Sequence, residues 1–253
     1  MRTKNIEKLA KNRKYFKIDE VRKILNVSPN ALKLILFRLE KAGRIERIEK
    51  GKYIIIPLGN EKGKYTLHEF VIASKLIKNY SIAYWSALNY YGFTEQIPTT
   101  VFVQTTERKK KTSLQVFGVK YRFVRIKKEK MFGLTHEWIE EEKIMITDRE
   151  KTIIDCLDRP DLCGGIIEAA KAIKGKEYDV VKLAKYAGLI GNSAVVRRLG
   201  YLCGLYSVNI GMEPEKTRNY VKLDPAMPLH RDKVDSKWKL YLNVDEKELG
   251  KLE

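Results

Sequence analysis

The sequence has few of the residues that build disulfide frameworks or metal sites. Among 253 residues there are three cysteines and three histidines. Cys156, Cys163 and Cys203 are odd in number and form no C-x-x-C pair, and no histidine lies in a metal-binding motif. This scarcity argues against a disulfide framework and a structural zinc site, and it fits a reducing cytosol. We therefore expect a cytoplasmic protein with no metal and no cofactor.

Long apolar runs are lacking as well. No run approaches the ~18 residues that a membrane-spanning helix needs, so we expect no membrane partner. The basic segment MRTKNIEKLAKNRKYFK has no continuous apolar core, which predicts that it is not a secretory signal. The hydrophobic fraction of 44% suffices for folded cores, and the length allows one large domain or two to three small ones.

Acidic residues are outnumbered, with 32 Asp and Glu against 50 Lys and Arg, a formal net charge of +18. Residues 1–58 hold 16 basic and 6 acidic side chains, whereas residues 59–253 hold 34 and 26. A positive field concentrated in this way favours a polyanion, either nucleic acid or an anionic membrane surface. A lysine-rich proteome also gives basic proteins: Lys occurs 35 times and Gln three, a bias typical of heat-adapted organisms.

The first 58 residues show the pattern of three helices followed by a hairpin. The helices are marked by three apolar stripes: Ile6, Leu9 and Ala10; Val21, Ile24 and Leu25; and Leu32, Ile35, Leu36 and Leu39. Asp19 is placed to cap the second helix, while Ser28 and Pro29 are placed to begin the third, which ends at Gly43. The segments RIERI and YIIIP, joined by EKGK, predict a two-stranded hairpin. This order predicts a winged helix-turn-helix domain over residues 1–58.

Such a domain binds double-stranded DNA by laying its third helix into the major groove, often as a homodimer on palindromic sites. Asn30 is placed to read a base edge, and Lys33, Arg38 and Lys41 are placed to hold phosphates. Two wing lysines would meet the backbone or the minor groove. The predicted DNA-binding residues are Ser28, Asn30, Lys33, Leu34, Phe37, Arg38, Lys41, Lys50 and Lys52.

Leu34 and Phe37 stand on the helix face that should be wet and polar. They can contact thymine methyl groups, or they can mean that another subunit or domain covers the helix. Winged helices also serve as protein-docking modules, which leaves an interaction protein that does not bind DNA as an alternative.

A polar linker, residues 59–66, precedes a second pattern over residues 67–253. The expected helices span 67–79, 164–175, 179–188 and 191–207, and another lies within 81–96 and ends near Gly92. The expected strands span 99–106, 114–127 and 142–147. Strands grouped before helices are typical of an α+β domain. The fold class is therefore α+β, with a winged helix-turn-helix followed by a larger mixed α+β domain.

The segment ITDREKTIIDCLDRP, residues 146–160, groups carboxylates beside a lysine, as a Mg²⁺-dependent PD-(D/E)xK-like nuclease would. However, Glu150 and Lys151 are adjacent, so on a strand they would point to opposite faces. A helix capped by Asp148 instead gives its apolar residues core spacing and sets Lys151 four positions before Asp155, as in a surface ion pair. Cys156 lies on its buried side as an inert thiol. We predict a structural helix and no enzyme, with the nuclease as the alternative.

Two further basic features are candidates for a second nucleic-acid contact. The segment ERKKKTS, residues 107–113, joins two predicted strands and is expected to be an exposed hairpin tip. It is either a solvated loop or a contact made by Arg108, Lys109, Lys110 and Lys111. A second patch would combine Arg197 and Arg198 with Lys182 and Lys185.

Five segments resemble the AbiEi family, the antitoxins of type IV toxin–antitoxin systems. They are YWSALNYYGFTEQIPTTVFVQTT, ITDREKTIIDCLDRPDLCGGIIEAAKAI, AVVRRLGYL, LDPAMPL and WKLYLN, in the order that the family has them. The resemblance implies a DNA-binding autorepressor whose second domain serves repression. In paired systems it also implies antagonism of a nucleotidyltransferase-like toxin.

Overall fold

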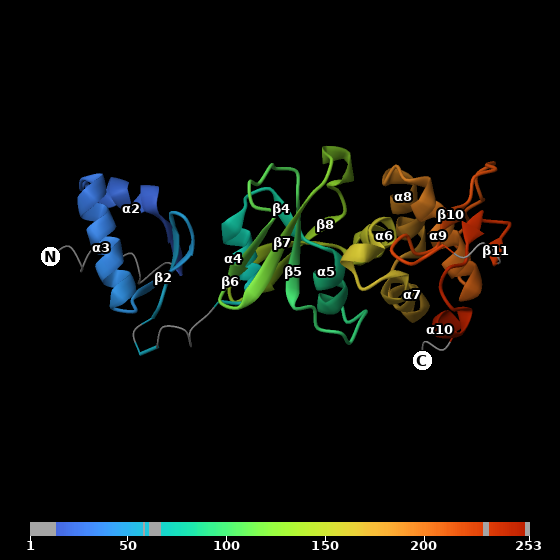
Figure 1. Ribbon diagram of the computed structural model, residues 1–253, viewed down its shortest axis with the longest axis horizontal. Helices are drawn as coiled ribbons and strands as arrows, with labels where there is room; N and C mark the ends of the chain where they lie inside the picture. Colours follow the sequence, from blue (N-terminus) through green and yellow to red (C-terminus); the bar gives the residue numbers. More distant parts are fainter. Residues whose placement is uncertain (1–13, 58, 61–66, 230–232, 251–253) are drawn as a thin grey trace. The chain divides into compact units, whose positions relative to one another are not determined.

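The computed structural model of the chain has a mixed α+β architecture (Figure 1). The residues that it describes are 14–57, 59–60, 67–229 and 233–250. The chain divides into two compact units. The first comprises residues 1–78, 115–119 and 139–142, and the second comprises residues 79–114, 120–138 and 143–253. The helix predicted around Ile6 and most of the predicted linker lie outside the described residues, so the division at 59–66 stays a prediction.

The described part of the first unit has two helices joined by a short turn, followed by a hairpin and then by a third helix. Its elements are β1 (Tyr15–Lys17), α2 (Ile18–Leu25), α3 (Pro29–Lys41), β2 (Ile45–Glu49), β3 (Lys52–Ile55) and α4 (Glu69–Leu76). The three strands form an antiparallel sheet in the order β1-β3-β2. One side of each helix packs on this sheet, and the core comprises Phe16, Val21, Leu32, Leu36, Leu39, Ile45, Tyr53 and Ile55.

Local signals place α3 where the sequence predicts it. The backbone N–H of Ala31 donates to Ser28 Oγ (3.3 Å), and Pro29 takes the first helical position, where its missing N–H is not needed. Gly43 follows the helix with φ +67°, and Gly51 makes the hairpin turn with φ +77°, both in the region that favours glycine. The predicted start of α3 and the turn at Gly51 are confirmed, whereas the hairpin strands span Ile45–Glu49 and Lys52–Ile55 rather than 44–48 and 53–57.

The second helix differs from its prediction. Lys17 rather than Asp19 is the N-cap of α2, because residues 15–17 form strand β1, which pairs with β3. The helix therefore begins two residues earlier, and Asp19 lies in its first turn. Val21 is buried as expected, but Ile24 is 52% exposed and does not belong to the core.

Helix α4 packs on β2 within the first unit. The Lys52 ammonium group donates to the Leu76 carbonyl (2.6 Å), and the Tyr15 hydroxyl donates to the Lys75 carbonyl (3.4 Å). Both bonds close the carboxyl end of α4 onto the three-stranded sheet. Residues beyond the predicted linker therefore complete the amino-terminal unit.

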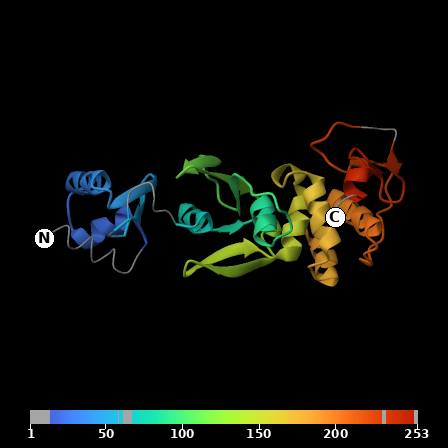
Figure 2. The same cartoon turned by 90° about the horizontal axis from the view of Figure 1, so that it is seen from below.

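A six-stranded sheet has the order β6-β7-β5-β4-β9-β8. Its strands are β4 (Tyr80–Ile82), β5 (Thr100–Thr105), β6 (Ser113–Val116), β7 (Val119–Arg125), β8 (Leu134–Ile139) and β9 (Glu142–Thr147). β4 runs antiparallel to β5 and parallel to β9, and β5 runs parallel to β7. The strands predicted at 99–106 and 142–147 are present, 114–127 is split by a turn, and β4 and β8 are additional. Figure 2 shows the sheet from below.

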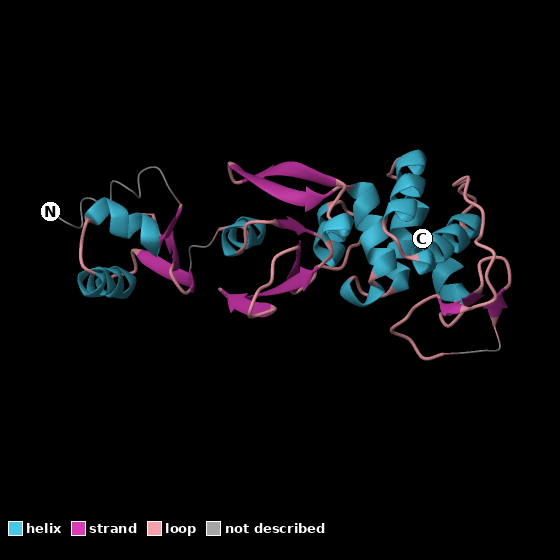
Figure 3. Ribbon diagram, turned by 90° about the horizontal axis from the view of Figure 1, so that it is seen from above, coloured by secondary structure: helices cyan, strands magenta, loops and turns pink. Residues whose placement is uncertain are grey.

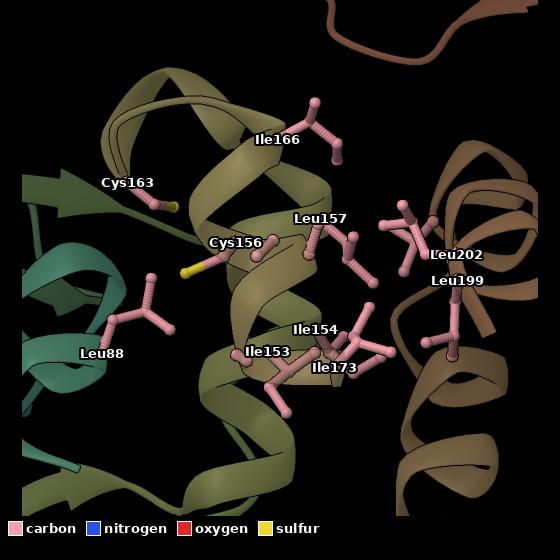
Figure 4. Packing of buried hydrophobic residues seen from close by; sticks show 14 of the residues in the cluster. Leu88, Ile153, Ile154, Cys156, Leu157, Cys163, Ile166, Ile173, Leu199 and Leu202 are labelled. Carbon is pink, nitrogen blue, oxygen red and sulfur yellow. The ribbon is translucent and has the colours of Figure 1, made fainter. Parts of the chain in front are cut away.

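In the second unit, α5 (Tyr84–Tyr90) lies between β4 and β5 in the chain, and the next four α-helices follow β9. These four are α6 (Arg149–Asp158), α7 (Ile166–Gly175), α8 (Val180–Leu189) and α9 (Ser193–Leu205), and Figure 3 shows the helices in cyan. Helix α6 packs against α5, α7, α8 and α9. Figure 4 shows its apolar side among neighbouring side chains: Ile153, Ile154, Cys156 and Leu157 with Leu88, Ile173, Leu199 and Leu202.

The last part of the chain folds onto α9. It contains β10 (Val221–Lys222), β11 (Val234–Asp235), β12 (Leu240–Tyr241) and α10 (Glu246–Gly250), with β12 between β10 and β11. A Cβ atom added at Gly200 of α9 would lie 2.2 Å from the ring of Trp238, which is itself buried. Only glycine therefore lets this indole ring lie against the helix. None of the helices in the described part of the chain is both long and apolar enough to cross a membrane.

Candidate nucleic-acid interface

Helix α3 has one buried side and one exposed side. Leu32, Leu36 and Leu39 are buried in the core, as the apolar spacing predicts. All the residues predicted to contact DNA from this helix are exposed: Ser28, Asn30, Lys33, Leu34, Phe37, Arg38 and Lys41. Phe37 is 62% exposed and Leu34 is 50% exposed. The structure thus brings the predicted helix residues together on one face.

The cations border this face. At about 100° per residue, Lys33 and Arg38 are separated by roughly 140° around the helix axis. Asn30, Leu34 and Phe37 project between them, on the side opposite the core. The one acidic residue of α3 is Glu40, which is half-buried and lies about 20° beyond Lys33, on the core side of that border. Lys41, in the last turn, lies between the two border cations. The exposed face between Lys33 and Arg38 therefore carries positive charge and no negative charge.

The hairpin offers one of its two predicted lysines. Lys50 is exposed in the turn between β2 and β3. Lys52 is 20% exposed, because its ammonium group lies 2.8 Å from the Glu49 carboxylate and also donates to the Leu76 carbonyl. Lys52 is therefore held within the unit, in contrast to the prediction that placed it at the wing tip.

Two exposed arginines beside the hairpin were not predicted. Arg44 precedes β2 and Arg47 lies within it, while Ile45 and Ile48 are buried. The available signal in RIERI was that each arginine directly precedes an apolar isoleucine, because neighbouring residues on a strand point to opposite faces. Arg47 adds positive charge on the strand that leads to Lys50, and Arg44 adds it at the start of that strand.

The segment 107–113 is not a hairpin tip. It connects β5 to β6, but β7 lies between these strands in the sheet. Arg108, Lys110 and Lys111 are exposed. The ammonium group of Lys109 lies instead over the ring of Phe123, 4.3 Å from its centroid. Three of the four predicted cations are thus presented to solvent, and Lys109 is held by an aromatic ring.

The second predicted patch is wrong. Arg197 and Arg198 are buried: Arg197 donates to the Asn219 carbonyl (2.8 Å), and Arg198 donates to the Leu157 carbonyl (2.7 Å). Burial lowers the pKa of Arg198 below its usual value. These guanidinium groups bind α9 to neighbouring segments through hydrogen bonds, and they do not form an exposed basic patch.

The acidic segment forms the helix that its apolar spacing predicts. Asp148 is the N-cap of α6 and accepts the Lys151 N–H (2.8 Å). Glu150 accepts the Asp179 N–H (2.8 Å) and pairs with Lys182 (2.8 Å), which links α6 to α8. Burial tends to raise the pKa of Glu150, but these two hydrogen bonds outweigh it and lower the pKa. Both carboxylates have structural partners.

The pair of Lys151 and Asp155 is not a surface ion pair. Both side chains are buried, and the Lys151 ammonium group donates to the Asp155 carboxylate. Burial raises the pKa of Asp155, although Lys151 acts to lower it. The sequence predicted the spacing but not the burial, which follows from the four helices around α6. The small interaction energy typical of an exposed ion pair on a helix therefore does not apply to this buried pair.

The described residues offer no metal centre and no exposed thiol. Within the described ranges, no three His, Cys, Asp or Glu side chains come together as a metal site would require. Cys156, Cys163 and Cys203 are buried free thiols, and burial raises the pKa of each above its usual value. Cys156 has the buried position that the sequence predicts.

Comparison with solved structures shows a fold that extends over nearly the whole chain. A crystal structure of the RV2827C protein from Mycobacterium tuberculosis is similar, with a TM-score of 0.68 over 94% of this chain and 89% of that one. The sequence identity is 11%, so the likeness concerns the fold. No curated protein sequence gives a significant match.

The family comparison concerns the region that contains the interface. Residues 5–56 match the family model described as "Transcriptional regulator, AbiEi antitoxin". This range includes α2, α3 and the three strands around them. The match confirms, for residues 5–56, the resemblance of this chain to the AbiEi antitoxin family of transcriptional regulators.

Proposed function

We propose that the chain is a transcriptional regulator that binds double-stranded DNA through a winged helix-turn-helix, with α3 in the major groove and the β2–β3 hairpin as the wing. The observation that carries this proposal is the exposed face of α3, which is bordered by Lys33 and Arg38 and has no acidic residue. Lys50 at the hairpin turn, with Arg44 and Arg47, extends the same charge. In this assignment residues 1–58 form the DNA-binding domain.

The remaining chain, residues 67–253, is assigned to assembly or to antagonism of a nucleotidyltransferase-like toxin. The protein then acts as an antitoxin-like autorepressor, and a homodimer fits the use of palindromic sites. No catalysis is assigned to it. In support, the carboxylates of Asp148, Glu150 and Asp155 in the acidic segment are engaged in capping, hydrogen bonds and ion pairs.

Charge reversal on α3 tests the proposal. The natural chain first selects a duplex from a pool of random sequences, and fluorescence anisotropy then measures its affinity. The double variant Lys33→Glu, Arg38→Glu is expected to bind this duplex roughly 100-fold more weakly at low salt, because two attractions become repulsions.

The matched control is Lys174→Glu with Lys185→Glu, which makes the same change in net charge on exposed positions of α7 and α8. It should alter the affinity far less. Equal affinities for the α3 variant and the natural chain would contradict the assigned surface.

The loop after β5 provides a second test. We propose that Arg108, Lys110 and Lys111 contact phosphates and lengthen the footprint. Replacing all three with alanine is then expected to make the log–log dependence of affinity on salt concentration shallower, by about 0.9 for each lost contact. Lys109→Ala is the control. Because the ammonium group of Lys109 is held over the Phe123 ring, this substitution should leave the slope unchanged. A triple variant with the natural slope would restrict the interface to the amino-terminal unit.

A further inference from the structure

The centre of the exposed face of α3 is apolar. Leu34 and Phe37 are three residues apart, so they lie side by side on the helix surface. Half or more of each side chain is open to solvent. Leu32, Leu36 and Leu39 on the opposite side already supply the core contacts of this helix. The two exposed side chains therefore form an apolar patch that the fold of its own unit does not need.

The position of this patch relative to the cations limits what it can contact. Lys33 and Arg38 border it on both sides, as side chains that hold the two phosphate backbones of a major groove would. Leu34 and Phe37 then point toward the base edges. The apolar group that base pairs display in this groove is the 5-methyl group of thymine.

Two polar side chains lie between these cations, Asn30 in the first turn of α3 and Lys41 at its last position. Asn30 is consistent with the same bases. Asn30 lies in the first turn of α3, the part of a recognition helix that contacts base edges. A side-chain amide can bond to N6 and N7 of adenine at once, whereas the pairing typical for guanine uses arginine or lysine. On α3 Arg38 stands at the border of the face, and Lys41, which lies between the border cations, is the last helical residue, about three turns from Asn30.

We propose that α3 reads A·T base pairs, with Leu34 and Phe37 contacting thymine methyl groups and Asn30 bonding to an adenine. This inference rests on the proposed function, because it takes DNA as the occupant of the face. A second copy of the chain fits less well. A symmetric pairing through the same patch would bring Lys33, Arg38 and Lys41 close to their own counterparts, with no acidic residue on the face to offset them.

The test removes single methyl groups from the DNA. Each thymine of the duplex selected by the natural chain is replaced in turn by uracil, which keeps the base pairing and lacks the methyl group. At one or more adjacent positions the affinity of the natural chain is expected to fall about fourfold, the effect of withdrawing one methyl group from an apolar contact.

Protein variants test the same contacts from the side of the protein. Leu34→Ala and Phe37→Ala are each expected to bind the thymine duplex several-fold more weakly and to lose the response to uracil at the positions they contact. Ile24→Ala, which shortens another exposed apolar side chain, is the matched control and should keep the full response. Circular dichroism checks that all three variants are folded, as is expected for exposed positions.

The outcomes separate the two proposals. If the chain binds the selected duplex but no uracil position changes its affinity, methyl recognition is overturned while DNA binding stands. If Leu34→Ala and Phe37→Ala instead abolish self-association in sedimentation experiments and leave the uracil response intact, the patch is an interface between copies. If no duplex is selected, the proposed function fails and this inference fails with it.

Discussion

Replacing Lys151 with methionine is expected to lower the free energy of unfolding by about 3–5 kcal/mol. Lys151 is fully buried in α6, and its ammonium group pairs with the carboxylate of Asp155, which is also buried. Without the lysine, that carboxylate stays among apolar helices and loses its closest cation. Urea unfolding followed by circular dichroism measures the loss.

The second substitution shows that the loss comes from the uncompensated charge. In the double variant Lys151→Met, Asp155→Leu, most of the lost stability should return, because an apolar pair of similar size replaces the ions. Lys174→Met on α7, an exposed position, should change the stability by less than about 0.5 kcal/mol. A single variant as stable as the natural chain would contradict the buried ion pair.

The loss in Lys151→Met should also depend on pH. Burial already raises the pKa of Asp155 in the folded chain, and removal of the lysine raises it further. A carboxyl group with a raised folded pKa ionises first in the unfolded chain, so rising pH favours unfolding. The difference between Lys151→Met and the natural chain should therefore be smaller at about pH 4 than at pH 7.

Gly200→Ala is expected to destabilise the chain by about 1–3 kcal/mol or more, although alanine is the better helix former. The added Cβ would lie 2.2 Å from the Trp238 ring, a rigid group that cannot move without displacing the segment around β12. The displaced indole should become more exposed. A red shift of tryptophan emission and faster proteolysis after α9 would report this change.

The same helix supplies the control. Gly204 also lies in α9, but a Cβ added there has nothing within 4 Å. Gly204→Ala should therefore leave the emission spectrum unchanged and stabilise the chain slightly, by about 0.5–1 kcal/mol. Indistinguishable stabilities for Gly200→Ala and Gly204→Ala would mean that Trp238 does not pack on this helix.

The sequence predicted those parts of the fold that depend on neighbouring residues. The cap at Ser28, the glycine turn after α3 and the Asp148 cap of α6 all follow from signals within a few positions. The exposed face of α3 follows from the same helical spacing. The residues of the candidate interface on α3 could therefore be predicted from the sequence.

The parts that could not be predicted depend on distant partners. β1 and β4 are three residues long and exist because they pair with β3, β5 and β9, so their own residues carry little signal. A helix was expected from residue 81 to about Gly92, but Ile82 pairs with Val103 and Ile146 before α5 begins. Likewise, Lys52 and Arg198 bind carbonyl groups far along the chain.

The way in which α4 closes on the small sheet affects how the amino-terminal part can be excised. The bonds from Lys52 and Tyr15 reach the carbonyls of Leu76 and Lys75. A fragment cut at residue 58 would uncover the sheet surface on which α4 packs and leave both donors without these acceptors. A fragment that keeps both acceptors must therefore extend past Leu76.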